Sequence, residues 1–325
     1  MDRESFLAWL SDADDLTGKQ RDEAARVLAE PASLASVLQL LEDRIDERRR
    51  CPHCRAEGAM RRGRANGLRR YHCGGCGRTF NAVTGTPLAR LRKKEHWAAF
   101  AAGLRDGDTV AGAADRCGVA RTTSFRWRHR FLRAIETGTV KLAGIVEADE
   151  TYVLASRKGE RKLDRKPRKR GGKATKRGLS KEQIAILVAA DRSGTTITGV
   201  LPEVTAEAIK NRLEPVIAKD AILVTDAASW FRPMARSLDL THERLNQTAG
   251  ERRRGDLHLQ TVNSRHERLK SFLRPKRGIA SKYLDSYLAW YHLAVLPKAP
   301  TPRSVLASVA GLIGPRIPES IANAN

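Results

Sequence analysis

The stretch Ile145-Val-Glu-Ala-Asp-Glu-Thr-Tyr-Val153 places three carboxylates inside a run that otherwise has the pattern of a β-strand. Because side chains alternate across a strand, Glu147 and Asp149 share one face, and Glu150 lies on the other. A carboxylate buried among strand neighbours is costly unless a cation compensates its charge. The stretch therefore predicts a strand with a cation-binding acid. The plainer alternative for Asp149 is an acid in a turn or on an edge strand.

Two further segments carry oxygen ligands of the same kind. Residues 221–226, Ala-Ile-Leu-Val-Thr-Asp, predict a buried strand that ends in an acid, at the edge where α/β folds gather their ligands. A helix N-cap is the alternative role for Asp226. Asn263, Glu267 and Lys270 stand at i, i+4 and i+7 of a predicted helix over 263–274 and share one face. Two strand carboxylates and an oxygen ligand on a nearby helix suit phosphoryl transfer with two Mg²⁺ or Mn²⁺ ions.

The surrounding pattern predicts a mixed α/β domain over residues 139–300. Short β-rich runs come first, a helix and a further strand follow, and helices complete the domain, as in folds where helices cover a sheet. The expected strands span 143–153, 183–190, 195–200 and 221–226, and the expected helices span 205–217, 263–274 and 282–296.

Four cysteines upstream form two CxxC pairs, Cys51/Cys54 and Cys73/Cys76, with eighteen residues between them. Two such turns can close a tetrahedral four-sulfur site, which predicts structural zinc in a zinc ribbon over residues 49–90. The alternative is four ordinary buried cysteines. We expect Gly74, Gly75 and Gly77 to permit the turn geometry. The basic hairpin between the pairs could lie along a phosphate backbone through Arg61, Arg62, Arg64 and Arg69.

Residues 91–138 predict a helical module with a helix-turn-helix. The first helix spans 110–116, Gly118 marks the turn, and a basic second helix starts at residue 122. A basic second helix is typical of a major-groove reader, and a structural hairpin is the alternative. The expected DNA-facing residues are Arg121, Arg126 and Arg128. Phe125, Trp127 and Phe131 are expected on the inward face, and Cys117 is expected to be a small buried residue.

Composition points to a polyanionic partner. The 325 residues contain 60 Lys+Arg against 37 Asp+Glu, a formal net charge of +23. Nucleic acid is the first candidate. A membrane is disfavoured because no apolar run approaches the roughly 18–20 residues of a spanning helix. The chain has five cysteines, four of them with metal-binding spacing, and an acidic rather than signal-like start, so we expect a cytoplasmic protein.

Three segments remain. Residues 1–48 predict a helical packing segment, and residues 301–325 a C-terminal tail. Residues 157–181 contain thirteen basic and two acidic side chains and interrupt the α/β domain. This insertion is either a solvated loop or an arm that becomes ordered on DNA phosphates. The expected contacts of the arm are Lys166, Arg168, Lys169 and Arg170.

The order of these motifs resembles the zinc-ribbon DDE transposases of bacterial insertion sequences. The similarity covers roughly residues 45–295, is closest to the ISXO-like group related to Merlin elements, and is most specific at residues 146–152. The resemblance implies a ribonuclease H-like catalytic core with two Mg²⁺ ions. Asp149 then corresponds to the first catalytic acid, Asp226 to the second, and Asn263, thirty-seven positions later, to the third ligand.

The third position departs from the commonest pattern because Asn replaces Glu. An amide oxygen binds Mg²⁺ but supplies no charge and cannot act as a base. Either Asn263 suffices, or Glu267 one turn later contributes the missing carboxylate. The resemblance also implies that His258 and Lys270 contact the scissile phosphate or neighbouring DNA.

The resemblance predicts a DNA transposase that binds the inverted-repeat ends of an insertion sequence, cleaves DNA with Mg²⁺ and transfers the freed strand. A homodimer or higher oligomer on DNA is expected because two ends must be brought together. Two alternatives remain. One is a catalytically inactive DNA-binding regulator derived from a transposase, and the other is a ribonuclease H-like nuclease without strand transfer.

Overall fold

The computed structural model describes residues 34–133, 141–163, 172–176, 179–276 and 278–295, with Thr17, Lys166, Val305 and Val309 as single residues. Most of the predicted segment 1–48 and nearly all of the predicted tail 301–325 lie outside these described residues. Inside the predicted segment, α3 spans Leu34–Arg48, as its helical pattern indicates.

Five strands form one mixed sheet in the order β6-β5-β4-β7-β8. The central β4 (Ile145–Leu154) runs antiparallel to β5 (Gln183–Asp191), which runs antiparallel to β6 (Thr196–Leu201). On the other side, β7 (Ile222–Asp226) and β8 (Thr241–Leu245) continue parallel to β4. This mixed sheet, in a chain that also carries several helices, confirms the predicted mixed α/β class.

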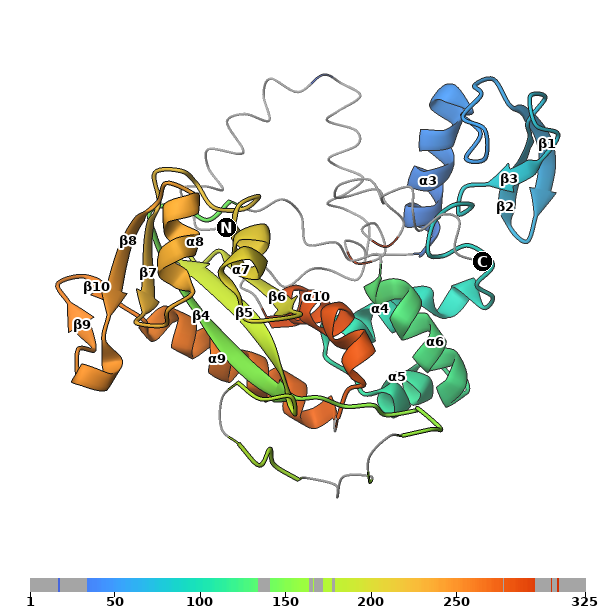
Figure 1. The fold of residues 1–325 in the computed structure, drawn as a ribbon. Coiled ribbons are helices and arrows are strands. Elements are labelled where there is room, and N and C mark those ends of the chain that lie inside the picture. Colours follow the sequence, from blue (N-terminus) through green and yellow to red (C-terminus); the bar gives the residue numbers. More distant parts are fainter. Residues whose placement is uncertain are drawn as a thin grey trace.

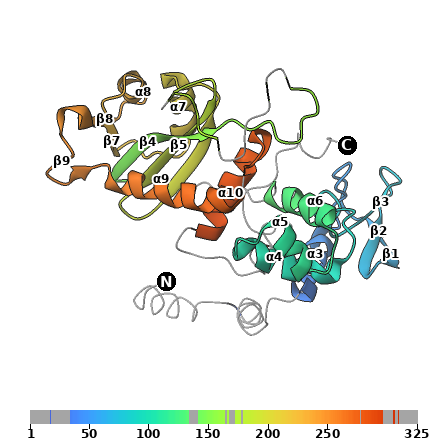
Figure 2. The same ribbon diagram turned by 90° about the horizontal axis from the view of Figure 1, so that it is seen from below.

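Helices cover both faces of this sheet (Figures 1 and 2). The short helices α7 (Ala206–Leu213) and α8 (Phe231–Ser237) pack on the face that includes Val146 and Ala148. The longer helices α9 (Gln260–Leu273) and α10 (Leu284–Val295) pack on the opposite face. Glu147 and Asp149, one position out of step with Val146 and Ala148, therefore face α9.

A second core joins the helical module to one of the helices that cover the five-stranded sheet. Helices α4 (Trp97–Arg105), α5 (Val110–Arg116) and α6 (Arg121–Leu132) pack with α3 and with one side of α10 (Figure 2). The buried aromatic residues of this core come from separate parts of the chain: Trp97, Phe100, Trp127, Phe131, Tyr287 and Trp290. Helix α10 therefore packs against the helical module on one side and against the sheet on the other.

The cysteine-rich segment forms a small antiparallel sheet in the order β1-β2-β3. Its strands are β1 (Met60–Ala65), β2 (Leu68–His72) and β3 (Thr79–Asn81), so the predicted basic hairpin between the cysteine pairs is present. The remaining elements are short: β9 (Arg253–Arg254), β10 (Leu257–His258), η2 (Lys94–His96), η3 (Gln247–Ala249), η4 (Arg274–Lys276) and η5 (Ser281–Tyr283).

Candidate functional site

Asp149 and Asp226 lie side by side on the central strands. In the parallel pairing of β4 with β7, Ala148 is the partner of Thr225, so the next residues of the two strands are also adjacent. Both acids stand on the face that α9 covers, because side chains alternate along each strand. Backbone groups hold both carboxylates: the Glu150 N–H donates to Asp149 Oδ1 at 2.8 Å, and the Ala228 N–H donates to Asp226 Oδ1 at 3.0 Å.

The electrostatics of this pair favour a bound cation. Burial, reinforced by the negative charge of Asp226, raises the pKa of Asp149 to about 6. Lys270 opposes this shift with its positive charge. A divalent ion bound beside Asp149 would offset the cost of placing its negative charge in a buried site next to Asp226. The oxygen donors at this point of the sheet therefore fit Mg²⁺ or Mn²⁺.

Glu150 occupies the opposite face of the same strand. The Trp230 Nε1–H donates to its Oε1 at 2.6 Å. Burial, with the nearby charge of Asp149, raises the pKa of Glu150 to about 8. Glu150 is therefore mostly a neutral carboxylic acid at pH 7. The alternation along β4 places it on the opposite face of the sheet from Asp149.

Helix α9 brings a second set of polar side chains to Asp149. His266 is buried, and its Nδ1 lies 3.9 Å from Asp149 Oδ2. Burial, with the charge of Lys270, lowers the pKa of His266 to about 4, so its imidazole is neutral at physiological pH. Asn263 lies one turn before His266 on this helix, on the exposed side. Glu267 is 69% exposed, and its Oε1 lies 3.3 Å from Lys270 Nζ.

A buried carboxylate beside the acid pair was not assigned a role from the sequence. Glu147 is fully buried, accepts a hydrogen bond from the Val262 N–H at 2.9 Å, and lies 3.0 Å from an Arg192 nitrogen. His258 belongs to the same cluster: its Nε2 is 2.6 Å from Arg192 Nη1, and its Nδ1 is 3.3 Å from Glu147 Oε1. His258, expected at DNA, is thus 20% exposed and engaged within the protein. The alternation at Glu147 was the only sequence signal for this cluster.

The four cysteine sulfurs lie within 4.8 Å of one another. Cys51 Sγ is 3.7 Å from Cys76 Sγ, and Cys54 Sγ is 3.5 Å from Cys73 Sγ. Sulfurs bound at about 2.3 Å to a tetrahedral zinc ion stand about 3.8 Å apart. The cluster therefore fits structural zinc.

Both cysteine turns use the same backbone conformation. The Arg55 N–H donates to the Cys51 carbonyl and the Gly77 N–H to the Cys73 carbonyl, each at 2.9 Å. Arg55 and Gly77 have φ values of 65° and 68°, in the left-handed region. Of the three glycines expected to shape the second turn, only Gly77 has such a φ; Gly74 and Gly75 do not. The left-handed conformation of the second turn is therefore at Gly77, directly after Cys76.

The arginines of the basic hairpin differ in their surroundings. Arg61 and Arg69 both pair with Asp46 of α3, and Arg64 lies 3.7 Å from Glu42 of the same helix. These ion pairs dock the small sheet on α3. Arg61 and Arg64 remain 59% exposed, and Arg62 is exposed on β1. The outer parts of these three side chains are accessible to a phosphate backbone.

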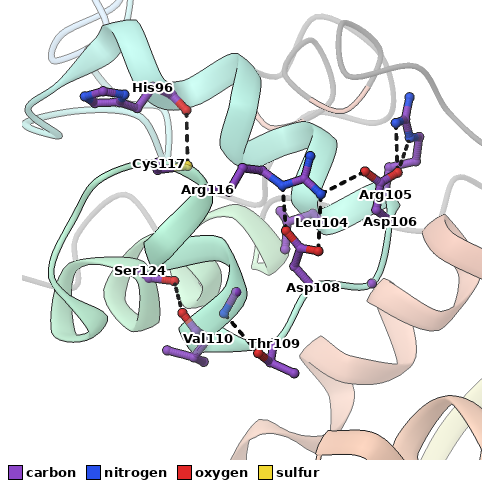
Figure 3. A network of polar contacts seen from close by, with 12 residues as sticks. His96, Leu104, Arg105, Asp106, Asp108, Thr109, Val110, Arg116, Cys117 and Ser124 are labelled. Atoms are coloured by element: carbon purple, nitrogen blue, oxygen red, sulfur yellow. Dashed lines mark hydrogen bonds and ion pairs between the residues drawn. The ribbon is translucent and has the colours of Figure 1, made fainter.

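A polar network fixes the geometry of α4, α5 and α6 (Figure 3). The Thr109 side chain accepts from the Gly112 N–H at 3.0 Å and caps α5, and Ser124 of α6 donates to the Val110 carbonyl at 2.9 Å. Arg116 donates to Asp108 at 2.7 Å and to Asp106 at 3.2 Å, which ties the end of α5 to the loop after α4. Gly118 between α5 and α6 has a φ of 57°, as a tight turn requires.

The basic side chains of α6 do not all face outward. Arg121 and Arg126 are exposed, as expected for residues that contact DNA. Arg128 is 2% exposed, which contradicts its expected DNA contact. Its guanidinium donates to the Asp108 carbonyl at 2.6 Å and lies 4.6 Å from the ring centre of Trp290 on α10.

Two other residues of the module have a different outcome from each other. Phe125, expected to face inward, is 40% exposed, whereas Cys117 is buried, as expected.

Of the four basic residues expected in the insertion 157–181, only Lys166 is among the described residues, where it is exposed. Arg168, Lys169 and Arg170 lie outside the described residues. Across the described part of the chain, every helix is too short or too polar to cross a lipid bilayer.

Sequence comparison with known proteins identifies relatives of this chain. Residues 141–291, which span the sheet and its covering helices, match the model of the ISXO2-like transposase domain. The chain is 31% identical over 250 residues to an uncharacterized protein in the transposable element ISH50 of Halobacterium salinarum, a match that covers 75% of this chain and 84% of the relative.

Similar solved structures include two Mos1 transposase assemblies. The pre-cleavage Mos1 transpososome is 15% identical with a TM-score of 0.28, and covers 69% of this chain and 77% of its own. The Mos1 paired-end complex with left transposon end is 16% identical with a TM-score of 0.26, and covers 66% and 75%. These structural similarities are distant. The sequence matches show that the chain belongs to the ISXO2-like transposase family.

Proposed function

We propose that the chain is a DNA transposase that cleaves the ends of an insertion sequence and joins the freed 3′ ends to target DNA. The observation that carries the proposal is the adjacency of Asp149 and Asp226 on parallel strands, beneath the helix that carries Asn263. In this proposal, Asp149, Asp226 and Asn263 hold two Mg²⁺ ions. When bound, these ions supply activation of the attacking oxygen and stabilisation of the leaving oxygen.

The protein's own residues orient this chemistry. The backbone N–H groups of Glu150 and Ala228 fix the two carboxylates in one orientation before metal or DNA arrives. His266 fills the space between α9 and Asp149 with a neutral ring and so excludes water from one side of that acid. Lys270, one turn further along α9, places a positive charge near Asp149, where a DNA phosphate gains from it.

We further propose that two modules bind the DNA ends. The zinc ribbon over 49–90 contacts phosphates through Arg61, Arg62 and Arg64, and the helical module over 91–138 acts as a helix-turn-helix that presents Arg121 and Arg126. The exposure of these five side chains supports the assignment. The catalytic domain spans 139–300. Because a transposition reaction joins two ends, we propose a homodimer or a higher oligomer on DNA.

A cleavage assay tests the catalytic proposal. The purified chain is incubated with Mg²⁺ and a duplex that carries the inverted repeats bracketing its reading frame. Nicked ends and joined product are expected from the wild type. Asp226→Asn is expected to bind the duplex and leave it uncut. Asp220→Asn serves as the matched control, because Asp220 is an exposed acid just before the other end of β7.

Each alternative function has its own result in this assay. Nicking without joined product would indicate a nuclease, and binding without nicking would indicate a DNA-binding regulator. Cleavage by Asp226→Asn at the wild-type rate would reject the assigned site.

A further inference from the structure

Helix α9 begins without a capping side chain of its own. Its N-cap residue is Leu259, which makes no side-chain hydrogen bond to the helix, and its first turn contains no acid. The first N–H groups of a helix lack intrahelical partners and usually take them from a Ser, Thr, Asp or Asn at the N-cap. Helices α5 and α7 follow this rule through Thr109 and Thr205. The start of α9 must therefore be held from elsewhere.

Glu147 of β4 supplies the missing cap from 115 residues away. Its Oε2 accepts the Val262 N–H at 2.9 Å, which is the bond that an N-cap side chain normally makes to the third helical residue. The Glu147 side chain is fully buried. The neighbouring Gln260 N–H donates to His258 Nδ1 at 3.2 Å.

Arg192 compensates the buried charge of Glu147 and connects the turn after β5 to the start of α9. One guanidinium nitrogen lies 3.0 Å from Glu147 Oε1 and donates to the Asp256 carbonyl at 3.1 Å. The other donates to Thr261 Oγ1, in the first turn of α9, at 3.3 Å. The turn between β5 and β6, which carries Arg192, thereby locks the start of α9 against the sheet.

We propose that Glu147, together with Arg192, is a positioning residue that sets the first turn of α9 against β4 and so holds Asn263 opposite Asp149 and Asp226. Glu147 lies two positions before Asp149 on the same face of the strand, and the residue it holds directly precedes Asn263. The Glu147 carboxylate thus links β4, which carries Asp149, to the first turn of α9, which carries Asn263. This role rests on the metal site proposed above.

Glu147→Gln tests the link because both carboxylate oxygens face donors: Oε2 accepts the Val262 N–H, and Oε1 is paired with the Arg192 cation. An amide, by contrast, has one oxygen and one NH₂ group. In either orientation the variant therefore places a donor against a donor. Glu150→Gln is the matched control: the strand and the substitution are the same, but Glu150 lies on the opposite face and bonds to Trp230.

Two measurements are made on the full chain. Hydrogen exchange, without metal or DNA, is expected to show faster exchange of the Val262 amide in Glu147→Gln than in the wild type and in Glu150→Gln. Calorimetric titration with Mn²⁺ is expected to show binding about 10- to 100-fold weaker in Glu147→Gln, the range for residues that orient a metal ligand. In an Asn263→Ala background, Glu147→Gln is expected to weaken Mn²⁺ binding no further, because the ligand that it positions is gone.

The outcomes separate this role from simple packing. Unchanged exchange at Val262, or an equal loss of Mn²⁺ affinity with and without Asn263, would overturn the proposal. If Glu147→Gln does not fold, Arg192→Met leaves the carboxylate in place, removes its cation, and is expected to shift both measurements in the same direction. Absence of Mn²⁺ binding in the wild type would reject the metal site itself and with it the role of Glu147 there. Unchanged exchange alone would reject only the role of Glu147.

Discussion

In the proposed metal site, Asn263 is a neutral amide, whereas the two ligands on the strands are acids. If Asn263 is the third ligand, Asn263→Ala removes an oxygen donor, and we expect DNA cleavage to fall by roughly 100-fold, equivalent to about 2.7 kcal/mol of barrier. Glu267→Gln is expected to cleave within about twofold of the wild type, because Glu267 is largely exposed and lies beside Lys270. Single-turnover cleavage of an end-bearing duplex measures both. The reverse order of effects would assign the role to Glu267.

Glu150 makes the stability of the metal-free protein depend on pH. Its pKa is raised from 4.5 to about 8 by burial and by Asp149, so the folded chain holds an extra proton between these values. The resulting stability is fully present below about pH 4.5 and is lost as the pH rises through 8. We expect the contribution of Glu150, measured with urea and a chelator as the difference in free energy of unfolding between the wild type and Glu150→Gln, to fall by a few kcal/mol from pH 5 to pH 9.

Glu150→Gln is expected to lack this pH-dependent contribution, because the amide has no proton to lose. Glu203→Gln, a change at an exposed acid, is expected to keep the wild-type dependence. An unchanged slope in Glu150→Gln would show that other groups cause it.

Sequence alternation predicted the faces of Glu147, Asp149 and Glu150, because the period of a strand is a local property. It could not predict that Glu147 caps α9, since the Val262 N–H comes from a segment 115 residues away. The same limit applies to Arg128. Arg126, Arg128 and Arg130 alternate along α6, and it is Arg128 that meets Trp290 of α10 and the Asp108 carbonyl, both distant in the sequence. Asn263 or Glu267 as third ligand stays a prediction.

The elements that the sequence predicted best have strong local signals. The helix expected over 110–116 has these bounds in α5, because Thr109 caps it and Gly118 ends the turn that follows. The strand β8 was not predicted: its sequence, Thr-His-Glu-Arg-Leu, is mostly polar because it forms an edge of the sheet and pairs only with β7. Helix α8 was also not predicted; it is only seven residues long and contains Pro233, which disfavours a helix interior.

The cysteine-rich segment 49–90 buries only a small core of its own, so we expect zinc to hold it together. Elemental analysis of the purified wild type is expected to give one zinc per chain. Cys73→Ser is expected to lose the metal and to expose the hairpin 60–72 to proteolysis, because the stacked pair Tyr71 and Phe80 loses its support. Cys117→Ser, a buried cysteine outside the cluster, is expected to keep the zinc. Full zinc content in Cys73→Ser would contradict the four-sulfur site.

The helical module is docked on η4 and α10 through the last turn of α4 and the loop that follows it. Three donors from different elements reach carbonyl groups of this segment: Trp290 Nε1 donates to Leu104 at 2.6 Å, Lys276 Nζ to Gly107 at 2.7 Å, and Arg128 to Asp108 at 2.6 Å. Burial lowers the pKa of Lys276 to about 8, and its ammonium lies 4.3 Å from the Trp290 ring centre. Two cations therefore flank one indole ring, an arrangement that fixes the module's orientation relative to the acid pair.

Because only one of the two is buried in this docking contact, we expect substitutions of Arg128 and Arg126 to differ in their effect on the free energy of unfolding. Arg128→Met leaves the Asp108 carbonyl without its donor and removes a cation from Trp290, so we expect a loss of about 1–3 kcal/mol in the free energy of unfolding. Arg126→Met, at an exposed position two residues earlier, is expected to leave stability within about 0.5 kcal/mol of the wild type. Urea unfolding followed by tryptophan fluorescence measures both.

In DNA binding, we expect Arg126→Met to have a larger effect than Arg128→Met, the opposite of their effects on stability. A side chain that neutralises one phosphate contributes about 0.9 to the slope of log affinity against log salt concentration. Arg126→Met is therefore expected to reduce that slope by about one for each copy bound, whereas Arg128→Met keeps the wild-type slope because its guanidinium lies inside the protein. If Arg128→Met lowered the slope as much as Arg126→Met, the helical module would have to separate from α10 when it binds DNA, and the docked arrangement would describe only the DNA-free protein.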